Sequence, residues 1–358
     1  MTKIILLSAG GTGGHFFPAI ALAEELQKTN CKIHLITDKR CEKYLSTDAK
    51  LESHIVNLHI KISGIVNKIR SAFQLITACI KTLFLMIRIK PDVVIGFGGY
   101  PTFPSLLAAK ALHIPIILHE QNCLLGKSNH FFASSAKLIA LSYQETANID
   151  KSLKKKITIT GDIVRSSIKK LPQKKNFNSQ IFHLFIFGGS QGAKIFSSLI
   201  PEAIEILLKQ HPDIQLFITQ QASKDQQVEL AKRYDKLGVK HELSDFFYMM
   251  HEIYNKSQLV ISRSGASTIA ELTSIGLPAI FIPLPDAAED HQYFNAKAIA
   301  DNDAGWYFRQ NDALAEKLAA KLAKLIADRT LLQNASNKLI ARKNDGAKNL
   351  AATVLKIM

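Results

Sequence analysis

Short runs of Ile, Val and Leu recur along the chain, and no polar residues alternate with the apolar ones. Strands buried on both faces have this pattern, and amphipathic stretches between them predict helices that connect parallel strands. A first series of runs occupies Ile4–Ser8, Lys32–Thr37, Val93–Gly96, Ile116–His119, Leu138–Ser142 and Ile157–Thr160. A second series occupies Phe182–Phe187, Ile214–Thr219, Leu259–Ser262 and Ala279–Ile282. We therefore predict an α/β fold with two doubly wound, Rossmann-like parallel sheets.

The strand pattern restarts after a polar, lysine-rich interval at 169–180. A length of 358 residues suits two domains, because single domains usually contain about 100–200 residues. We expect one domain over 1–161 and a second over 162–340. The last stretch, 341–358, places Leu350, Val354 and Ile357 on one helical face, and we expect this helix to pack back onto the first domain.

Composition narrows the class of protein. Hydrophobic residues make up 47% of the chain, which excludes a disordered or collagen-like protein. The four cysteines lie far apart without a C-x-x-C pair, and the N-terminus has no signal-peptide pattern, so we expect a reducing, cytosolic environment. A formal net charge of +15 suits nucleic acid, an anionic membrane surface or a phosphate-rich substrate as partner, and a lysine-rich proteome would also produce it.

Three glycine- or serine-rich turns each follow a predicted strand directly and precede a helix. The first is Gly10–His15, followed by Pro18, which we expect in the first turn of a helix over 19–26. The others are Gly188–Gly192 and Ser262–Thr268. Such turns let a backbone approach a ligand closely and present helix N–H groups to an anion. Together they predict a phosphate or nucleotide ligand at the carboxyl ends of the strands.

Two familiar phosphate motifs fail on spacing. A dinucleotide fingerprint starting at Gly11 needs glycine where Phe16 stands, although Asp38 at the end of the second strand keeps an NAD-dependent oxidoreductase open as an alternative. Gly126–Ser128 ends like a P-loop, but the first glycine of that motif would fall at Gln121. An ATPase is therefore excluded. A nucleic-acid binder is disfavoured because the lysines are dispersed and no stacking aromatic residues lie between them.

Residues 70–89 form an unusually apolar helical stretch. Its polar residues fall within one narrow stripe: Arg70, Gln74, Thr77, Lys81 and Arg88. Cations inside the stretch argue against a membrane-spanning helix. Two interpretations stay open: a buried cover helix with one solvated stripe, or an interfacial helix on an anionic membrane. In the second, the membrane contacts are Phe73, Ile76, Ile80, Lys81, Phe84 and Arg88.

Six motifs occur together and in order: Gly10–His15 with Phe17-Pro18, Gly98–Tyr100, His119–Asn122, Gly188–Gly192, Arg263–Ala266 and Gln292–Ala296. From Lys3 to about Ala298, this set resembles the MurG family, bacterial UDP-N-acetylglucosamine transferases that act on lipid I. The resemblance implies a GT-B glycosyltransferase fold, with two domains facing an interdomain cleft. The N-terminal domain would meet the lipid acceptor, and the C-terminal domain would bind UDP-GlcNAc.

The implied reaction is inverting transfer of GlcNAc to the C4 hydroxyl of MurNAc-pentapeptide on undecaprenyl diphosphate. This step converts lipid I to lipid II in peptidoglycan synthesis. The resemblance also implies that the enzyme uses no cofactor and is a peripheral protein at the cytoplasmic face of the bacterial inner membrane, with other cell-wall enzymes as further partners. A UDP-sugar epimerase of the same fold is the alternative, disfavoured by the segments Gly98–Tyr100 and His119–Asn122.

Carried over motif by motif, the resemblance implies contacts to UDP-GlcNAc at Thr12, Gly13, Gly14, Asn122, Arg165, Ser190, Phe247, Ala266, Ser267, Thr268, Ile269, Ala270, Glu271 and Gln292. Glu271 also stands one turn into its helix, where a carboxylate can bind a ribose diol. The chain departs from the family twice. It has His291-Gln292 where paired glutamines are usual, and Phe247 aligns with an isoleucine that packs beside uracil.

Inverting transfer needs a base for the acceptor hydroxyl and stabilisation of the departing diphosphate. His15 ends the first glycine turn and is the leading candidate base, with Glu120 as its rival. We find no D-x-D pair after a strand and no His/Cys cluster with ligand spacing, so we expect no metal. Glycine-turn amides, a helix dipole and Arg165 would instead stabilise the leaving UDP. His34 and His54 show no mutual spacing, and we expect ordinary structural or surface roles for them.

Overall fold

The computed structural model describes residues 2–45, 51–56, 58, 64–173, 177–189, 193–312 and 314–358, and the chain divides into two units. Unit 1 contains Met1–Arg165 and Asn344–Met358, and unit 2 contains Ser166–Lys343. The boundary falls slightly beyond the expected position at 161. Ile163 belongs to the core of unit 1, and the guanidinium of Arg165 lies 4.6 Å from the centre of the Phe17 ring.

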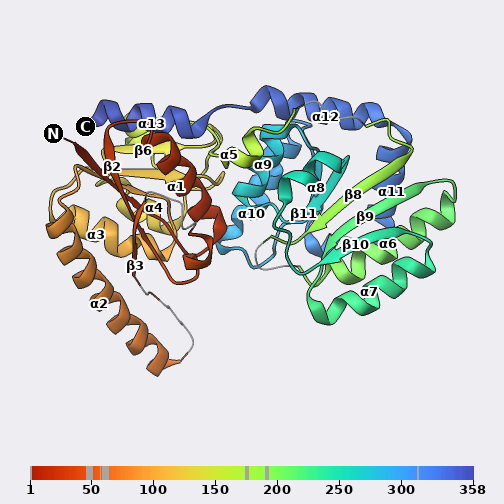
Figure 1. Ribbon diagram of the computed structural model, residues 1–358, viewed down its shortest axis with the longest axis horizontal. Coiled ribbons are helices and arrows are strands. Elements are labelled where there is room, and N and C mark those ends of the chain that lie inside the picture. The colour runs from red at the N-terminus through yellow and green to blue at the C-terminus, as the bar shows by residue number, and fades with distance from the viewer. Residues whose placement is uncertain are drawn as a thin grey trace. The chain divides into compact units, whose positions relative to one another are not determined.

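Among the described residues, seven strands form the sheet of unit 1, in the order β3-β2-β1-β4-β5-β6-β7 (Figure 1). All of its ladders are parallel. The strands are β1 Lys3–Ser8, β2 Cys31–Thr37, β3 Glu52–Ile55, β4 Val93–Gly96, β5 Ile116–Glu120, β6 Leu138–Leu141 and β7 Ile157–Ile159.

Unit 2 has a six-stranded parallel sheet within the described ranges, in the order β10-β9-β8-β11-β12-β13. Its strands are β8 Ile181–Phe187, β9 Gln215–Gln221, β10 Lys240–Ser244, β11 Leu259–Ser262, β12 Ala279–Phe281 and β13 Trp306–Tyr307. The predicted strands of both units are confirmed to within two residues. The apolar pattern missed β3, β10 and β13, which lie at sheet edges where one flank needs no burial.

Helices connect the strands in both units. Unit 1 contains α1 Gly13–Leu26, α2 Ile65–Ile89, α3 Phe103–Ala111, α4 Lys127–Ala133 and α13 Gly346–Ile357. Unit 2 contains α5 Ser166–Lys169, α6 Phe196–Gln210, α7 Lys224–Lys236, α8 Met250–Lys256, α9 Ala266–Ile275, α10 His291–Ala300, α11 Ala315–Ala327 and α12 Arg329–Arg342. Short 3₁₀ turns cover Glu42–Tyr44, Tyr100–Thr102, Lys151–Lys156, Ala288–Asp290 and Gln310–Asp312.

The sheet of unit 1 is covered on both faces, which explains why its strands are continuously apolar. Ile5 and Leu7 pack in one core with residues of α1 and α13. Leu6 and Ile36 point the other way, into a second core that contains Met86 of α2 and residues of α3 and α4. Side chains alternate between the two faces of a strand, so both sets must be apolar.

The start of α1 differs from the prediction. The helix begins at Gly13, so the glycine turn itself winds into the first helical turn and Pro18 lies in the helix interior. Proline has no N–H, so the carbonyl four residues earlier, at Gly14, receives no helical hydrogen bond from it. His15 consequently sits in the first turn of a helix, where its side chain is fixed by the backbone.

The final helix α13 packs along α1 in unit 1 (Figure 1). Gly346 opens this helix, and its N–H donates to the carbonyl of Asp162 at 3.1 Å. A Cβ at Gly346 would lie 2.4 Å from the carbonyl oxygens of Gly161 and Asp162. Only glycine allows the chain to pass so close to this backbone when it returns from unit 2.

Gly346→Ala should therefore lower the free energy of unfolding by about 1–3 kcal/mol, because the new methyl group forces α13 away from its seat. Urea unfolding of the variant and the wild type measures the difference. Lys348→Ala, at an exposed position of the same helix, is the control and should change stability by less than about 0.5 kcal/mol. Equal stability of Gly346→Ala and wild type would show that the close approach is not required.

Candidate active site

Three loops of unit 1 meet around His15. They follow β1, β4 and β5, which are neighbours in the sheet, so their carboxyl ends lie at one edge. The loop after β1 supplies His15, the loop after β4 supplies Phe97, Gly98 and Gly99, and the loop after β5 supplies Gln121. Nδ1 of His15 lies 2.8 Å from the carbonyl oxygen of Phe97 and 2.7 Å from the side-chain amide of Gln121.

These contacts assign the tautomer of His15. The Phe97 carbonyl can only accept a hydrogen bond, so Nδ1 carries the proton and donates it. The Gln121 amide presents its Nε2 to Nδ1, and its Oε1 has no partner among the described residues. Because two N–H groups cannot hydrogen-bond to each other, rotating the amide by 180° places Oε1 beside Nδ1, where it accepts from this N–H. Nε2 is then the basic nitrogen of the ring. The assignment follows from the hydrogen-bond network.

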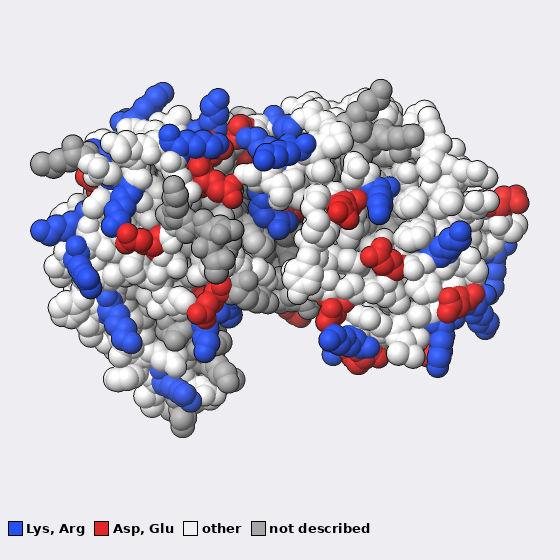
Figure 2. Space-filling view, viewed as in Figure 1, with Lys and Arg blue, Asp and Glu red and all other residues white. Residues whose placement is uncertain are grey.

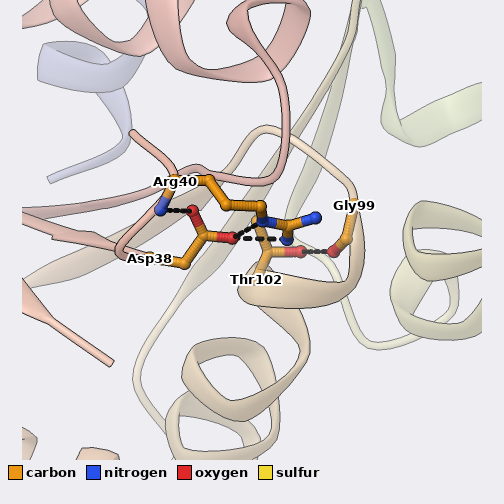
Figure 3. Close-up of polar contacts among 4 residues, drawn as sticks. All are labelled: Asp38, Arg40, Gly99 and Thr102. Carbon is orange, nitrogen blue, oxygen red and sulfur yellow. Dashed lines mark hydrogen bonds and ion pairs between the residues drawn. The ribbon is translucent and has the colours of Figure 1, made fainter. Parts of the chain in front are cut away.

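Gly98 and Gly99 make room for the His15 ring. Both have positive φ, at 84° and 79°. Residues other than glycine rarely adopt this backbone conformation. A Cβ at Gly99 would lie 3.2 Å from Cδ2 and 3.3 Å from Nε2 of His15. The Thr102 hydroxyl holds the turn by donating to the Gly99 carbonyl at 2.8 Å (Figure 3). The Gly-Gly pair thus fixes which side of the imidazole faces the turn.

A cation that the sequence analysis did not single out lies beside the first glycine turn. Arg40 donates to the Asp38 carboxylate through Nε at 2.9 Å (Figure 3). Its NH2 group would be 3.4 Å from a Cβ at Gly11. The sequence signal was an Asp-x-Arg spacing directly after the second strand. Because the Asp38 carboxylate is buried and engaged by Arg40, the feature that had suggested NAD is explained without a cofactor.

Both carboxylate oxygens of Glu120 accept hydrogen bonds from residues that follow it in the chain. One carboxylate oxygen accepts from the backbone and side chain of Asn122, at 3.0 and 2.9 Å. The other accepts from the Gly126 N–H at 3.0 Å and from Asn129 at 2.9 Å. The side chain is buried. A carboxylate that accepts four hydrogen bonds organises a loop well and has little capacity left to take a proton from a substrate.

His119 lies behind this loop, fully buried against the ring of Phe97. Burial lowers its pKa to about 3, since a charged imidazolium would be placed in an apolar interior, and the nearby His15 adds to the effect. His119 is therefore neutral near physiological pH.

In unit 2 the candidate donor residues gather around the start of α9. Ala266 begins this helix directly after the loop that follows β11, so its first N–H groups and the positive end of its dipole face outward. Ser267 and Thr268 in the first turn are half-buried. Ile269 and Ala270 are buried, and the Ile269 N–H donates to the Gly265 carbonyl at 3.1 Å, so these two residues support the first turn from within the protein.

Glu271 and Phe247 are linked through an aromatic cluster. The buried Tyr254 donates its hydroxyl hydrogen to Glu271 at 3.1 Å and packs against Phe185 with ring centres 6.0 Å apart. Phe247 meets Phe185 edge to face at 5.7 Å. The half-buried Phe247 ring and the buried Glu271 carboxylate are therefore joined by one set of packed rings, those of Phe185 and Tyr254.

Gln292 and Arg263 form hydrogen bonds to the loop that follows β12. The side-chain oxygen of Gln292 accepts from the Leu284 N–H at 3.0 Å, and its carbonyl accepts from the Ser264 hydroxyl at 2.7 Å. Arg263 is buried and donates to the carbonyls of Ile282 and Pro283. A cavity of about 400 Å³ adjoins this loop and is lined by Pro283, Leu284, Pro285, Asp290, Arg309, Gln310, Asn311 and Asp312.

The remaining predicted site residues fall in three places. Thr12, Gly13 and Gly14 lie at the start of α1, with Thr12 exposed, and Asn122 lies beside Glu120. Arg165 stacks on Phe17 and belongs to unit 1. Ser190 lies outside the described residues. The structure thus assembles one group of residues in unit 1 and another in unit 2.

The exposed face of α2 is apolar. Phe73 and Phe84 are each 68% exposed, and exposed residues of the same kind follow at three- and four-residue steps: Ile69, Ile76, Ile80 and Ile87. Ala78, Thr82 and Met86 are buried, and the helix packs on α3. The interpretation of α2 as a buried cover helix is therefore wrong. Among the described residues, its segment Ile69–Ile89 is the one helix long and apolar enough to cross a membrane.

Comparison with known proteins identifies the family. Models of the N-terminal and C-terminal domains of glycosyltransferase family 28 match residues 5–141 and 183–350. Curated N-acetylglucosamine transferases of Rickettsia canadensis and Rickettsia bellii are 50% and 48% identical to the chain, and each alignment covers at least 98% of both proteins. The crystal structure of Acinetobacter baumannii MurG superposes with a TM-score of 0.78 at 28% identity, over 99% of this chain and 100% of that one. The chain belongs to the MurG family.

Membership of the MurG family makes this chain a glycosyltransferase with a GT-B fold. The two parallel sheets are the two Rossmann-like domains of that fold, and the glycine turns lie at their carboxyl edges. A plant UDP-glucosyltransferase from Polygonum tinctorium shares the fold at 11% identity, with a TM-score of 0.73. The motifs that set the MurG family apart are therefore carried by loops on a widely used scaffold.

The low pKa of His119 predicts a specific acid sensitivity. The folded pKa of about 3 lies below the ordinary value, so as pH falls below about 6.5 the unfolded chain binds a proton that the folded chain does not. Between pH 7 and pH 5 this group should cost about 2 kcal/mol of unfolding free energy. Urea unfolding at both pH values should show a smaller loss for His119→Leu. His211→Gln, at an exposed histidine, should behave like wild type, and an unchanged loss in His119→Leu would contradict the assignment.

Proposed function

We propose that this chain transfers GlcNAc from UDP-GlcNAc to the MurNAc-pentapeptide of lipid I and so forms lipid II. The observation that carries the proposal is identity of 46–50% with relatives that bear the name of this activity, almost all of them aligned over nearly their whole length. The glycine turns and their neighbours supply the kinds of group that such a reaction requires. No observation on the chain favours an epimerase.

The residues around α9 form our proposed donor site. The α9 N-terminus offers backbone N–H groups and a dipole to the diphosphate, and Ser267 and Thr268 add hydroxyl groups in its first turn. Phe247 is placed to cover a uracil ring, and Glu271, held by Tyr254, is placed to accept from a ribose diol. Both groups suit one ligand because they share the aromatic cluster at the same sheet edge.

His15 is our proposed general base, with Gln121 and the Phe97 carbonyl as positioning groups. Because Nδ1 carries its proton toward these groups, the basic lone pair of the ring is on Nε2, which we propose takes the acceptor proton. Gly98 and Gly99 hold the ring in this orientation, and Arg40 places a cation near the same turn. We assign Glu120 to loop organisation, because its four hydrogen bonds already satisfy both oxygens.

The apolar face of α2 supports a peripheral membrane location, and we place it on the cytoplasmic side because the donor is a soluble nucleotide. The cations Arg70, Lys81 and Arg88 lie along one side of this face and are exposed, and basic side chains follow the surface over α2 and α3 (Figure 2). An interfacial helix has this layout. The opposite side of α2 packs on α3, which a helix surrounded by lipid would not do.

A direct assay tests the function. The purified chain is incubated with UDP-GlcNAc and a short-chain lipid I analogue, and disaccharide-linked product and UDP are measured together. Release of UDP with disaccharide product is expected. Conversion of UDP-GlcNAc to another UDP-sugar in the absence of the acceptor would instead identify an epimerase. If correctly folded protein formed neither the disaccharide product nor UDP, the proposal would be refuted.

His15→Ala should lower kcat roughly a hundredfold or more, because the acceptor hydroxyl then loses its proton to water. Initial rates at saturating donor and acceptor give kcat, and their concentration dependence gives both KM values. His130→Ala, at a histidine of α4 that is 43% exposed, is the matched control and should keep normal turnover. Near-normal kcat with a raised donor KM for His15→Ala would make His15 a positioning residue.

Replacing Phe73 and Phe84 with serine should weaken binding to vesicles that contain anionic lipid. Each ring contributes about 1.5–3 kcal/mol when it is transferred from water to an apolar phase. Vesicle sedimentation at low and high salt measures the effect, and salt should also weaken wild-type binding because each basic residue near the surface contributes about 1 kcal/mol. Val228→Ser, which changes an exposed apolar residue of α7 in unit 2, is the control. Equal binding of the double variant and the wild type would contradict an interfacial role for α2.

A further inference from the structure

Three potential metal ligands meet on strands β2 and β3, away from the glycine turns. Nδ1 of His34 lies 3.1 Å from Nε2 of His54 and 3.3 Å from a carboxylate oxygen of Glu52. One ligand atom from each of the three residues lies within 4.8 Å of the others. His34 and His54, for which the sequence shows no mutual spacing, are therefore neighbours across two strands.

Strand pairing explains why these residues meet. β2 and β3 pair in parallel, with His34 opposite Glu52 and Ile36 opposite His54. Glu52 and His54 are two residues apart on one strand, so both point to the same face of the sheet. Ile36 also lies on that face, and it packs in a core that contains Met86 of α2. The spacing is invisible in the sequence because the two strands are joined by a long connection.

We propose that His34, Glu52 and His54 form a Zn²⁺ site that ties the edge strand β3 to β2. Two imidazoles and one carboxylate are a donor set that zinc uses, with Zn–N distances of about 2.0–2.1 Å and Zn–O distances of about 2.0–2.2 Å. Neighbouring ligands of a tetrahedron with such bonds lie about 3.3–3.5 Å apart. The His34–His54 and His34–Glu52 separations of 3.1 and 3.3 Å are close to this edge length.

The surroundings suit a bound cation at a partly open site. His34 is 4% exposed, so one ligand is held rigidly by the sheet, whereas Glu52 faces solvent and leaves an entry path. Lys32 binds the second carboxylate oxygen of Glu52 at 2.8 Å, which orients the carboxylate and leaves the first oxygen for the metal. Lys32 and Arg88 also act electrostatically on His54. Their positive charge opposes the metal and should limit its affinity.

The site would act on the structure of unit 1 and takes no part in the transfer reaction. β3 is a short strand at the sheet edge, and among the residues that the structure describes β2 is its one partner. A metal bridging the two strands adds a crosslink that exists only in the folded chain, so binding should raise the melting temperature.

The test uses untagged full-length protein that has been stripped with a chelator and then titrated with Zn²⁺ by calorimetry. Wild type should bind one equivalent and melt at a higher temperature with zinc. Glu52→Gln and His54→Gln should each weaken binding at least tenfold and abolish the thermal shift. A hydrogen-bonded cluster without metal affinity would show none of these changes.

His241→Gln is the matched control. His241 also lies on an edge strand, β10, beside a carboxylate, that of Asp235, at 3.9 Å, but no second histidine joins it in that contact. Its replacement should leave zinc binding unchanged. The proposal is overturned if wild type binds no stoichiometric zinc, or if one equivalent remains bound when Glu52 and His54 are both replaced. Neither result depends on transferase activity, so the outcome is separate from the proposed function.

Discussion

The reversal of strand order in each sheet is the constraint on which both candidate sites depend. In unit 1 the chain winds outward from β1 through β2 and β3, and then returns to start again at β4, directly beside β1. Unit 2 repeats the plan, with β8 and β11 adjacent at its centre. Loops that leave two such neighbouring strands diverge to opposite faces of the sheet, and the space between them takes the ligand. His15 and Gly98–Gly99 lie at the first reversal, and the N-terminus of α9 lies at the second.

Polar groups behind the reversal in unit 1 differ in ways that favour His15 as the proposed base. Glu120 has its lone pairs filled by four donors, and His119 is kept neutral by burial. His15 is half-buried, and its Nδ1 lies beside the Phe97 carbonyl. Histidine and carboxylate side chains are equally common as candidate bases when only the sequence is known. The four hydrogen bonds to Glu120 and the burial of His119 are what separate these two residues from His15.

The sequence predicted the strands well because the interior of a parallel sheet is apolar on both faces, and a run such as that of β1 has no other stable environment. It failed at the edges. β3 contains Glu52, Ser53 and His54, which no burial pattern marks as a strand. The same failure hid the His34–Glu52–His54 cluster, because a contact between strands depends on their register. Side-chain partners such as Gln121 for His15 were likewise beyond reach: the residue stood in a recognised motif, but its role follows from the approach of two loops.

Helix α2 carries both exposed apolar side chains and exposed basic ones, so it combines part of the net charge of +15 with part of the apolar content of the chain. Six large apolar side chains on one face of α2 are exposed to water, and a contiguous surface of this kind is unusual for a protein that works alone in solution. Their transfer to an apolar phase would release on the order of 10 kcal/mol. In the membrane contact that we propose, Arg70, Lys81 and Arg88 would add attraction to anionic headgroups, which falls with salt, whereas the apolar contribution does not. The buried side of α2 packs on α3, and the loop before α3 contains Gly99. In the membrane-bound state that we propose, α2 would therefore also set where the His15 turn meets an acceptor carried on lipid.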